Sequence, residues 1–451
     1  MKKKLFAVLL CLSMTAGLLP YAAWAAEPEH RHCVCGLETA ADANHTHSKG
    51  TKWVGITSLD EITAEHSRYY LKNNVFLSES WRPRQNIELC LNGYSLVGTT
   101  VSDTIRKTED CTLVLTDCSE NETGKITHSK GGGGRGISNE KGTLALWRGS
   151  VCGNLKNSAG AGVVNAQGAT FNLYGGSVAN NVTTDYGQGA GVYNRGALTM
   201  SGGQISGNYA SASGGGIFNY GGTVSISGTA VIRNNRTSAD NSSAYGGGIE
   251  NSLGTLTITG GEISGNSSNC GGGVYNEANA NSSPGKNAGS FTMTGGEIKG
   301  NSAVAAGGGI YNIANGDSVL TVTIAGNAMI SENDAKNGGG IGTNGAGVML
   351  TIAENAKIKN NTAADTENLS NGDGGGVFLR GDSYSGYGTL ILTGGEICGN
   401  SARRGGGIYK MAGSALRMEG GALTDNTACL LYTSPSPRGI PSPTALRIIC
   451  I

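Results

Sequence analysis

Six cysteine and histidine side chains lie close together near the amino terminus, at His30, His32, Cys33, Cys35, His45 and His47. Thiolate sulfur and imidazole nitrogen are ligands that zinc prefers, and four of these residues would complete a tetrahedral set: Cys33, Cys35, His45 and His47. Four protein ligands leave no open coordination position, so such a zinc would be structural rather than catalytic. In an oxidising compartment the two cysteines could instead form a disulfide, with each other or elsewhere. A Cys-x-Cys spacing is less diagnostic than Cys-x-x-Cys, so a third alternative, neither a metal site nor a disulfide, also stays open.

Aromatic residues occupy one position of a repeated motif: Tyr193, Phe218, Tyr275, Tyr311, Phe378 and Tyr409. Each follows an Ile or Val that would face a core, and neighbouring strand residues point to opposite faces, so the rings should point outward. Glu250 fills the same position in another copy, and a buried unpaired carboxylate is costly, so we expect this column to be partly exposed. Exposed rings in a column could bind sugar rings or a protein partner. The alternative is that they stack on one another or lie beneath loops.

Two glutamates share one repeat position in successive copies, at Glu262 and Glu297. In stacked strands their carboxylates would lie on the order of 5 Å apart. Such a pair can raise the pKa of one member and act as acid and base, or bind calcium with a third oxygen. The alternative is two solvated glutamates that repel each other mildly.

The cysteines of the later sequence do not form a disulfide framework. Cys152 and Cys398 replace the same repeat residue eight copies apart, which at ~4.8 Å per stacked strand is far beyond the reach of a bridge. Cys90, Cys111 and Cys118 are close enough in sequence for one bridge, but the sequence does not assign the pair.

The element that must position these residues recurs ten times between Gly133 and Ala428, at intervals of 25 to 36 residues. Clear copies read Gly-Gly-Gly-Ile/Val-Tyr-Asn, then Thr-Leu-Thr-Met/Ile, then Glu-Ile-Ser-Gly-Asn. Each copy contains three short segments of alternating apolar residues, separated by glycines that supply sharp corners. Short strands of this kind can bury their apolar side only by coiling and stacking copy on copy. The sequence therefore predicts an all-β protein, a right-handed parallel β-helix of about 11–12 coils.

Two asparagine columns accompany the repeat, and stacked amides of this kind hydrogen-bond from coil to coil. We therefore expect both columns to be structural. The first contains Asn165, Asn194, Asn219, Asn251, Asn276 and Asn312, and the second contains Asn154, Asn208, Asn235, Asn266, Asn301, Asn333, Asn361, Asn400 and Asn426.

The chain divides into five segments. Residues 1–25 have three lysines before an apolar stretch that ends in Ala-Trp-Ala, as expected of a secretory signal peptide. Residues 26–56 are the Cys/His-rich segment, and residues 57–132 should hold a short capping helix, begun by Ser58-Leu-Asp-Glu61, and the irregular first coils. Residues 133–428 are the repeats. Residues 429–451 resemble the translation of a transposase adapter used in sequencing libraries, the alternative being a genuine Pro/Ser linker.

Composition excludes some partners. The chain has 33 basic and 33 acidic residues, and loss of the signal peptide would remove three lysines, so no excess of positive charge attracts nucleic acid. No segment beyond the signal is long and apolar enough to span a membrane.

The chain resembles secreted right-handed β-helix proteins of Gram-positive gut bacteria, within the pectin-lyase-like superfamily. The resemblance covers about residues 30–428 and includes the opening His30–Gly36 and the stretch from Arg68 to Gly93. The Gly-Gly-Gly-Ile-Tyr-Asn element is also similar to the repeat of chlamydial polymorphic outer-membrane proteins. The resemblance implies a secreted or surface protein, often adhesive. The superfamily's lyases and hydrolases use clustered aspartates with a basic residue, and this sequence lacks such a cluster.

These observations favour a secreted or cell-surface protein that binds glycans or extracellular proteins and does not catalyse a reaction. A polysaccharide lyase or glycoside hydrolase on the same scaffold is the first alternative. A structural spacer for a further domain or anchor is the second.

Overall fold

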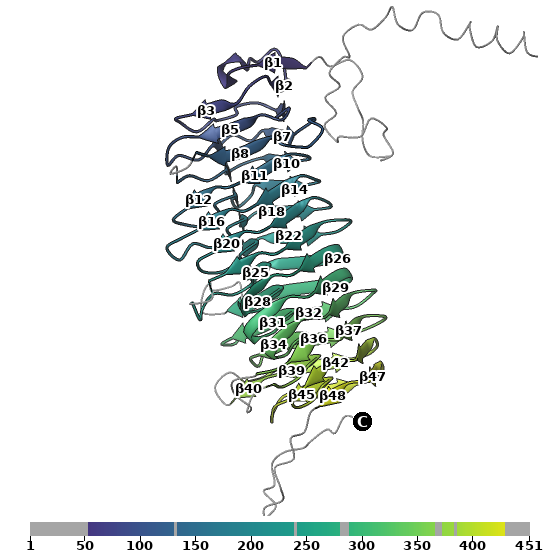
Figure 1. The fold of residues 1–451 in the computed structure, drawn as a ribbon. Helices are drawn as coiled ribbons and strands as arrows, with labels where there is room; N and C mark the ends of the chain where they lie inside the picture. Colours follow the sequence, from purple (N-terminus) through teal and green to yellow (C-terminus); the bar gives the residue numbers. More distant parts are fainter. Residues whose placement is uncertain are drawn as a thin grey trace, which may run out of the picture. The chain divides into compact units, whose positions relative to one another are not determined.

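The computed structural model describes residues 53–129, 133–238, 241–279, 288–365, 372–382 and 386–428. All of them belong to one compact unit, Val34–Ile451, whereas none belongs to a second unit, Met1–Cys33. The described residues form a parallel β-solenoid of about 11 turns, with strands stacked in sequence order from β1 to β48 (Figure 1). The predicted all-β parallel β-helix is confirmed. The expected signal peptide and the tail from residue 429 lie outside the described residues.

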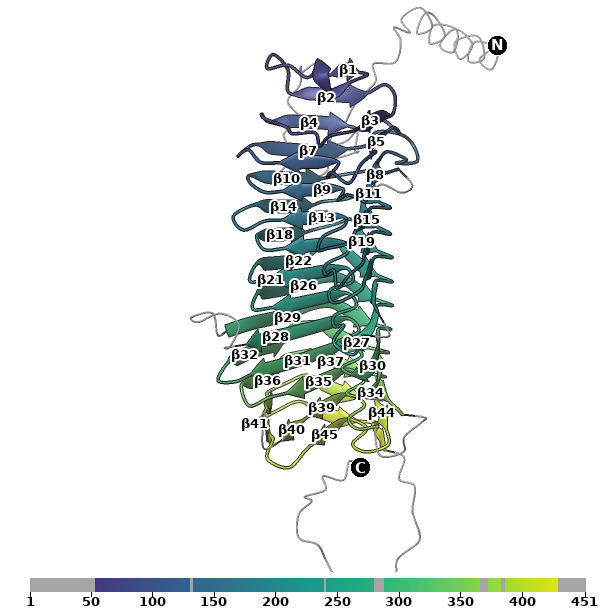
Figure 2. The same ribbon diagram turned by 90° about the vertical axis from the view of Figure 1, so that its left-hand side faces the viewer.

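Each regular turn contains four strands, which stack on their counterparts in four parallel ladders. Ladder 1 contains the strand that follows the glycine run of each repeat. Its strands β28, β31 and β35 follow one another in Figure 2. It comprises β6 (Ile105–Lys107), β9 (Ile137–Asn139), β13 (Val163–Asn165), β17 (Val192–Asn194), β21 (Ile217–Tyr220), β25 (Ile249–Ser252), β28 (Val274–Asn279), β31 (Ile310–Asn315), β35 (Ile341–Asn344), β39 (Val377–Leu379) and β45 (Ile408–Lys410).

Ladders 2 and 3 belong to one sheet because two long strands, β26 (Thr255–Ser264) and β29 (Ala288–Lys299), run through both. The other strands of ladder 2 are β1 (Val54–Ile56), β2 (Arg68–Leu71), β4 (Ile87–Cys90), β7 (Thr112–Thr116), β10 (Thr143–Leu146), β14 (Thr170–Leu173), β18 (Ala197–Met200), β22 (Thr223–Ile226), β32 (Val319–Ile324), β36 (Val348–Ile352), β42 (Thr389–Leu392) and β46 (Ala415–Met418). Those of ladder 3 are β3 (Val75–Leu77), β5 (Ser95–Gly98), β8 (Lys125–His128), β11 (Ser150–Cys152), β15 (Ser177–Ala179), β19 (Gln204–Ser206), β23 (Val231–Arg233), β33 (Met329–Ser331), β37 (Lys357–Lys359), β43 (Glu396–Cys398) and β47 (Ala422–Thr424).

Ladder 4 was not predicted, since most of its strands have only two residues and show no alternation. It follows the second asparagine column and comprises β12 (Leu155–Lys156), β16 (Val182–Thr183), β20 (Tyr209–Ala210), β24 (Arg236–Thr237), β27 (Ser267–Cys270), β30 (Ser302–Ala306), β34 (Asp334–Asn337), β38 (Thr362–Ala363), β44 (Ser401–Ala402) and β48 (Thr427–Ala428). A small antiparallel pair, β40 (Gly381–Asp382) and β41 (Gly386–Tyr387), lies outside the ladders.

The alternation predicted for ladder 2 is confirmed. Leu198 and Met200 pair with Val224 and Ile226 of the next coil, and all four side chains are buried in the central core. Thr199, between the first two, is partly exposed. Full burial of an aliphatic side chain contributes about 1.5–3 kcal/mol, so the column of stacked apolar residues supplies the main driving force for coiling.

The glycine run before each ladder 1 strand is required by close contact between coils. Gly271 adopts a left-handed backbone with φ of 65°. A Cβ atom on Gly272 would lie 2.3 Å from the carbonyl oxygen of Ser302, and one on Gly273 would lie 2.6 Å from that of Gly309. Real Cβ atoms do not approach backbone oxygens this closely, so the second and third glycines allow successive coils to touch.

Both predicted asparagine columns are buried hydrogen-bonded ladders. In each, the Nδ2 group of one asparagine donates to the Oδ1 atom of the asparagine in the next coil, over 2.7–3.3 Å in the first ladder and 2.9–3.0 Å in the second. The structure adds Asn139 to the first ladder and Asn181 to the second. Every amide has the same orientation, which leaves Asn139 Oδ1 and Asn312 Nδ2 without a hydrogen-bond partner at the two ends of the first ladder.

The predicted capping box is present at the amino end of the solenoid. Ser58 precedes a single 3-10 turn, Leu59–Glu61, and the Glu61 carboxylate accepts a hydrogen bond from the Ser58 backbone N–H at 2.9 Å. Leu59 is buried against the core. The first coils, expected within residues 57–132, include strands β4, β5, β7 and β8.

Candidate functional site

The proposed zinc ligands Cys33, Cys35, His45 and His47 lie outside the described residues. Among the residues that are described, no group of three or more His, Cys, Asp or Glu side chains is arranged to hold a metal ion. The zinc site therefore stays a prediction.

The aromatic column lies outside the central core, as its alternation predicted, but most of it is covered. Phe218, Tyr275, Tyr311 and Phe378 are only 4–6% exposed, so the expectation of an exposed column is wrong for these four residues. The rings stack in pairs, with centroid distances of 5.4 Å for Tyr193–Phe218, 5.7 Å for Tyr275–Tyr311 and 6.0 Å for Phe378–Tyr409. Tyr193 and Tyr409 are the members that remain partly exposed.

These rings are buried because the segments before the glycine runs fold over ladder 1 and form a second, smaller core with them. Tyr245 stacks on Tyr275 at 4.5 Å, and Cys270 and Ala306 complete the cluster with Tyr311. The sequence argument assumed that a column containing a glutamate must reach solvent. The structure shows that the covering segments bury this glutamate as well.

Glu250 lies between Phe218 and Tyr275 in ladder 1 and is 5% exposed. Its Oε2 atom has no hydrogen-bond partner. Burial raises the pKa of the Glu250 carboxyl to about 8. A hydrogen bond with Ser213 has a smaller, opposite effect on this pKa, and the charge of the nearby Glu277 adds to the increase. The cost of a buried charge is thus avoided because the carboxyl group holds a proton at neutral pH.

Glu262 and Glu297 are adjacent in ladder 3, as predicted, but they do not form an acid–base pair. The Lys299 ammonium lies 3.0 Å from Glu262 and 3.3 Å from Glu297, so both carboxylates share one positive charge. A hydrogen bond from Ser264, together with Lys299, lowers the pKa of Glu262, whereas a catalytic acid would need a raised value. The hypothesis of a raised pKa is therefore wrong for Glu262, because the sequence argument did not consider Ser264 and Lys299, which follow the inward Ile of each strand.

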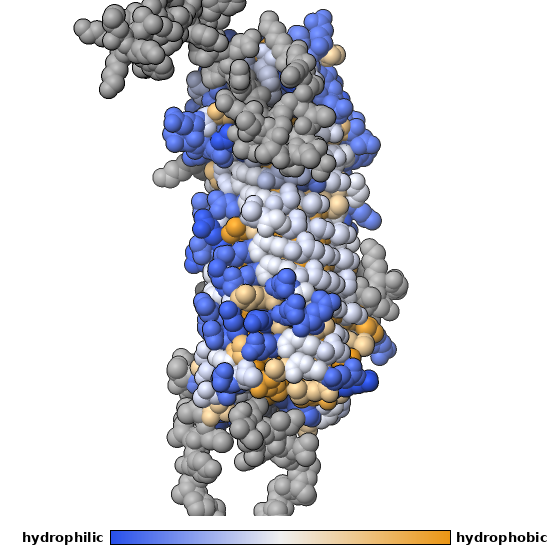
Figure 3. All heavy atoms as spheres, turned by 90° about the vertical axis from the view of Figure 1, so that its right-hand side faces the viewer, coloured by the Kyte–Doolittle hydropathy of each residue, from blue (hydrophilic) through white to orange (hydrophobic). Residues whose placement is uncertain are grey.

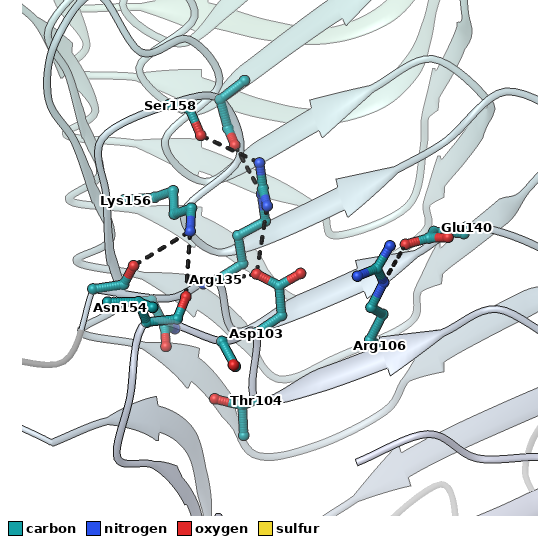
Figure 4. Close-up of polar contacts among 12 residues, drawn as sticks. Asp103, Thr104, Arg106, Arg135, Glu140, Asn154, Lys156 and Ser158 are labelled. Carbon is teal, nitrogen blue, oxygen red and sulfur yellow. Dashed lines mark hydrogen bonds and ion pairs between the residues drawn. The ribbon is translucent and has the colours of Figure 1, made fainter. Parts of the chain in front are cut away.

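A polar cluster at the early coils uses its basic side chains to join successive turns (Figure 4). Arg135 forms a 3.4 Å ion pair with Asp103 and donates to the Ser158 hydroxyl, while Arg106 lies 2.7 Å from Glu140. Partly exposed ion pairs contribute about 1 kcal/mol or less. This cluster therefore fits a structural role.

An open groove of about 420 Å³ lies where ladder 2 turns into ladder 3. It is lined by residues of five successive coils: Glu122, Gly149, Ser150, Gly176, Ser177, Gly203, Gln204 and Val231. At ~4.8 Å per coil the groove extends for roughly 20 Å along the solenoid. Its lining offers hydroxyl, amide and carboxylate groups beside one apolar side chain.

Two stacked aromatic rings stand beside this groove. Trp147 and Tyr174 come two residues before Gly149 and Gly176, and their centroids are 4.2 Å apart. Tyr174 is 38% exposed. The next coil has Ser201 at this position, so the ring stack ends at Tyr174. Arg148, between Trp147 and Gly149, pairs with Glu122 of the lining at 2.8 Å.

Figure 3 shows one long side of the solenoid, where pale residues of intermediate hydropathy are stacked in rows and hydrophilic residues gather along one edge. Thr, Ser and Gly, which fill most outward positions of ladder 2 and the turn after it, have this intermediate hydropathy. A surface of this kind offers hydroxyl groups and backbone rather than charge.

The groove was missed from the sequence, although a signal is present. The position after the ladder 2 strand is Ser or Thr in several copies, such as Ser201, Ser227 and Thr259, but it is Trp147 and Tyr174 in two consecutive ones. Large aromatic residues that interrupt a column of small polar ones indicate a local surface feature.

Comparison with known protein families, with curated proteins and with solved structures found no significant match. Within the described part of the chain, no helix has the length and apolar character needed to cross a membrane.

Proposed function

We propose that this protein is a secreted or cell-surface β-solenoid that binds a glycan without chemical change, in the groove beside Trp147 and Tyr174. The observation that carries the proposal is the exposure of Tyr174, 38%, at the end of a ring stack that lies beside a groove lined by hydroxyl and amide groups. The apolar C–H face of a sugar ring packs against an aromatic face, and its hydroxyl groups need hydrogen-bonding partners.

The repeat distance supports a linear glycan along the solenoid axis. Ser150, Ser177 and Gln204 come from successive coils and present one polar side chain every ~4.8 Å. This is close to the length of one pyranose unit, so consecutive sugars can meet equivalent groups. The Ser177 hydroxyl donates to Ser150 at 2.9 Å, and Gln204 Oε1 accepts from Arg233 at 3.1 Å, which fixes the orientation of both polar groups.

The groove chemistry supports binding rather than hydrolysis. Most glycoside hydrolases use two carboxyl groups that flank the scissile bond. Of the described residues that line the groove, Glu122 alone carries a carboxylate, and Arg148 pairs with it.

The test is a glycan array probed with the protein, followed by calorimetry on the glycans retained. Tyr174→Ala should weaken binding about tenfold, or about 1.4 kcal/mol, because it removes the stacking face. Tyr186→Ala is the matched control, since Tyr186 is 82% exposed but does not line the groove. Equal affinity of wild type and Tyr174→Ala would reject the groove. Release of new reducing or unsaturated ends would reject the non-catalytic assignment, and binding to none of the glycans on the array would reject the ligand class.

A further inference from the structure

We propose that Cys90 and Cys118 are a disulfide-forming pair that joins two of the early coils by a covalent bond. Their sulfur atoms lie 3.0 Å apart, and the Cys118 backbone N–H also points at the Cys90 sulfur, at 3.3 Å. The separation of the sulfur atoms is shorter than the sum of two sulfur van der Waals radii. Closure therefore needs only a small movement of the two side chains.

The backbone already holds both cysteines in place. Cys90 ends β4, where it pairs with Thr116 of β7, and Cys118 follows two residues later. The turn after β7 is fixed by the buried Asp117 carboxylate, which accepts hydrogen bonds from Gly93 at 2.8 Å and Gly124 at 2.6 Å. The Cys118 sulfur is further oriented toward Asn92 Oδ1 at 3.6 Å. A disulfide that requires no backbone rearrangement forms with little strain.

The structure selects this pair from the three candidates that the sequence left open. Cys111 is buried elsewhere, and its sulfur donates to the Pro83 carbonyl oxygen at 3.7 Å. Cys152 and Cys398 occupy the same position of ladder 3 with seven strands between them, as expected from the repeat.

The reaction has a defined order because the two thiols differ in exposure. Cys118 is partly exposed and Cys90 is buried behind it. The Cys118 thiolate attacks a small disulfide such as glutathione disulfide, forming a mixed disulfide and releasing one glutathione thiolate. The hydrogen bond with Cys118, together with burial, raises the pKa of Cys90, and the reaction of Cys118 removes that hydrogen bond. Cys90 then loses its proton and attacks the Cys118 sulfur, which expels the second glutathione thiolate.

The net change converts two thiols and one glutathione disulfide into the protein disulfide and two glutathione molecules. Disulfide oxidants of this kind persist in the oxidising compartments outside the cytoplasm and not in the cytoplasm itself. The predicted signal peptide would deliver the chain to the first kind of compartment.

The test is peptide mass mapping of the full chain after incubation with glutathione disulfide and alkylation without reduction. We expect a peptide pair linked through Cys90 and Cys118, with Cys111, Cys152 and Cys398 alkylated. Alkylation of both Cys90 and Cys118 in the folded protein, or a link from either to Cys111, would overturn the proposal.

Single variants test the order of reaction. In Cys90→Ser, Cys118 should retain one glutathione as a mixed disulfide; in Cys118→Ser, the buried Cys90 should remain unmodified. The opposite pattern would refute the assigned roles. A reductant should lower the melting temperature of the wild type but not of Cys90→Ala/Cys118→Ala. Cys152→Ala/Cys398→Ala is the matched control and should respond to the reductant like the wild type; an equal response of all three proteins would count against the bond.

Discussion

Replacing Glu250 with glutamine should remove a pH dependence of stability that the wild type shows between about pH 4.5 and 8. The carboxyl group is buried between Phe218 and Tyr275, and its pKa rises from 4.5 to about 8 in the folded protein. Glu277, Tyr245 and Tyr275 are the ionisable groups that face it, and the raised pKa of each tyrosine keeps both neutral in this range. Glutamine has nearly the same shape and does not titrate.

The sign follows from where the proton is held. Below pH 4.5 the carboxyl group is protonated in both the folded and the unfolded chain, and its contribution to stability is fully present. Between pH 4.5 and about 8 the unfolded chain loses the proton while the folded chain keeps it, so stability falls as the pH rises. At 1.36 kcal/mol per pH unit, the loss between 4.5 and about 8 amounts to roughly 5 kcal/mol.

The assay is urea unfolding of wild type and Glu250→Gln at pH 5, 6, 7 and 8. Because repeat proteins can unfold in parts, hydrogen exchange of strands β21, β25 and β28 should be measured at the same pH values. The difference in unfolding free energy between the two proteins should grow steadily in favour of the variant as the pH rises. A constant difference across this range would refute the conclusion that Glu250 is protonated in the folded state.

Two further substitutions test the asparagine ladders and the glycine runs. Asn208→Ala should lower the unfolding free energy by about 2–3 kcal/mol, because it leaves the Val178 carbonyl and the Asn181 amide without their buried partners. Asn426→Ala, at the partly exposed end of the same ladder, should lower it by about 1 kcal/mol or less. Equal denaturant midpoints for the two variants would contradict this ranking. Gly272→Ala should lower the unfolding free energy by about 3 kcal/mol, since its Cβ atom would lie 2.3 Å from the Ser302 carbonyl oxygen. Gly300 has a φ of 57°, but a Cβ atom there would have no atom within 4 Å, so Gly300→Ala should lower the unfolding free energy by only about 1 kcal/mol.

The sequence predicted the coil, its inward residues and the two asparagine columns, because these repeat at nearly every turn. It omitted Asn181, whose neighbour Asn180 is also an asparagine, and the two-residue strands of ladder 4, which are too short to show a period. Repetition carried the fold, whereas strands too short to show alternation were missed although they recur in ten of the described coils.

The candidate site depends on features that do not repeat. Burial of Tyr275 and Tyr311 results from segments of variable length that place Tyr245 and Cys270 above them. Lys299 pairs with Glu262, but the residue at its ladder 3 position differs from coil to coil and is Ser264 in the preceding one. The groove beside Tyr174 arises where two consecutive turns carry aromatic residues. Individual contacts of this kind follow from three-dimensional packing and not from the period of the repeat.

The uniform orientation of the asparagine amides gives the solenoid a direction. Each Oδ1 atom of the second ladder faces the amino end, where the imidazole Nδ1 of His128 lies 2.9 Å from Asn154 Oδ1, and each Nδ2 group faces the other end. The amide dipoles therefore add along the axis, with partial negative charge at the first coil and partial positive charge at the last. A further coil can extend such a ladder only if its own amides have the same orientation. Two solenoids that shared an end could continue their ladders head to tail and not head to head, so the asparagines make any longitudinal assembly polar.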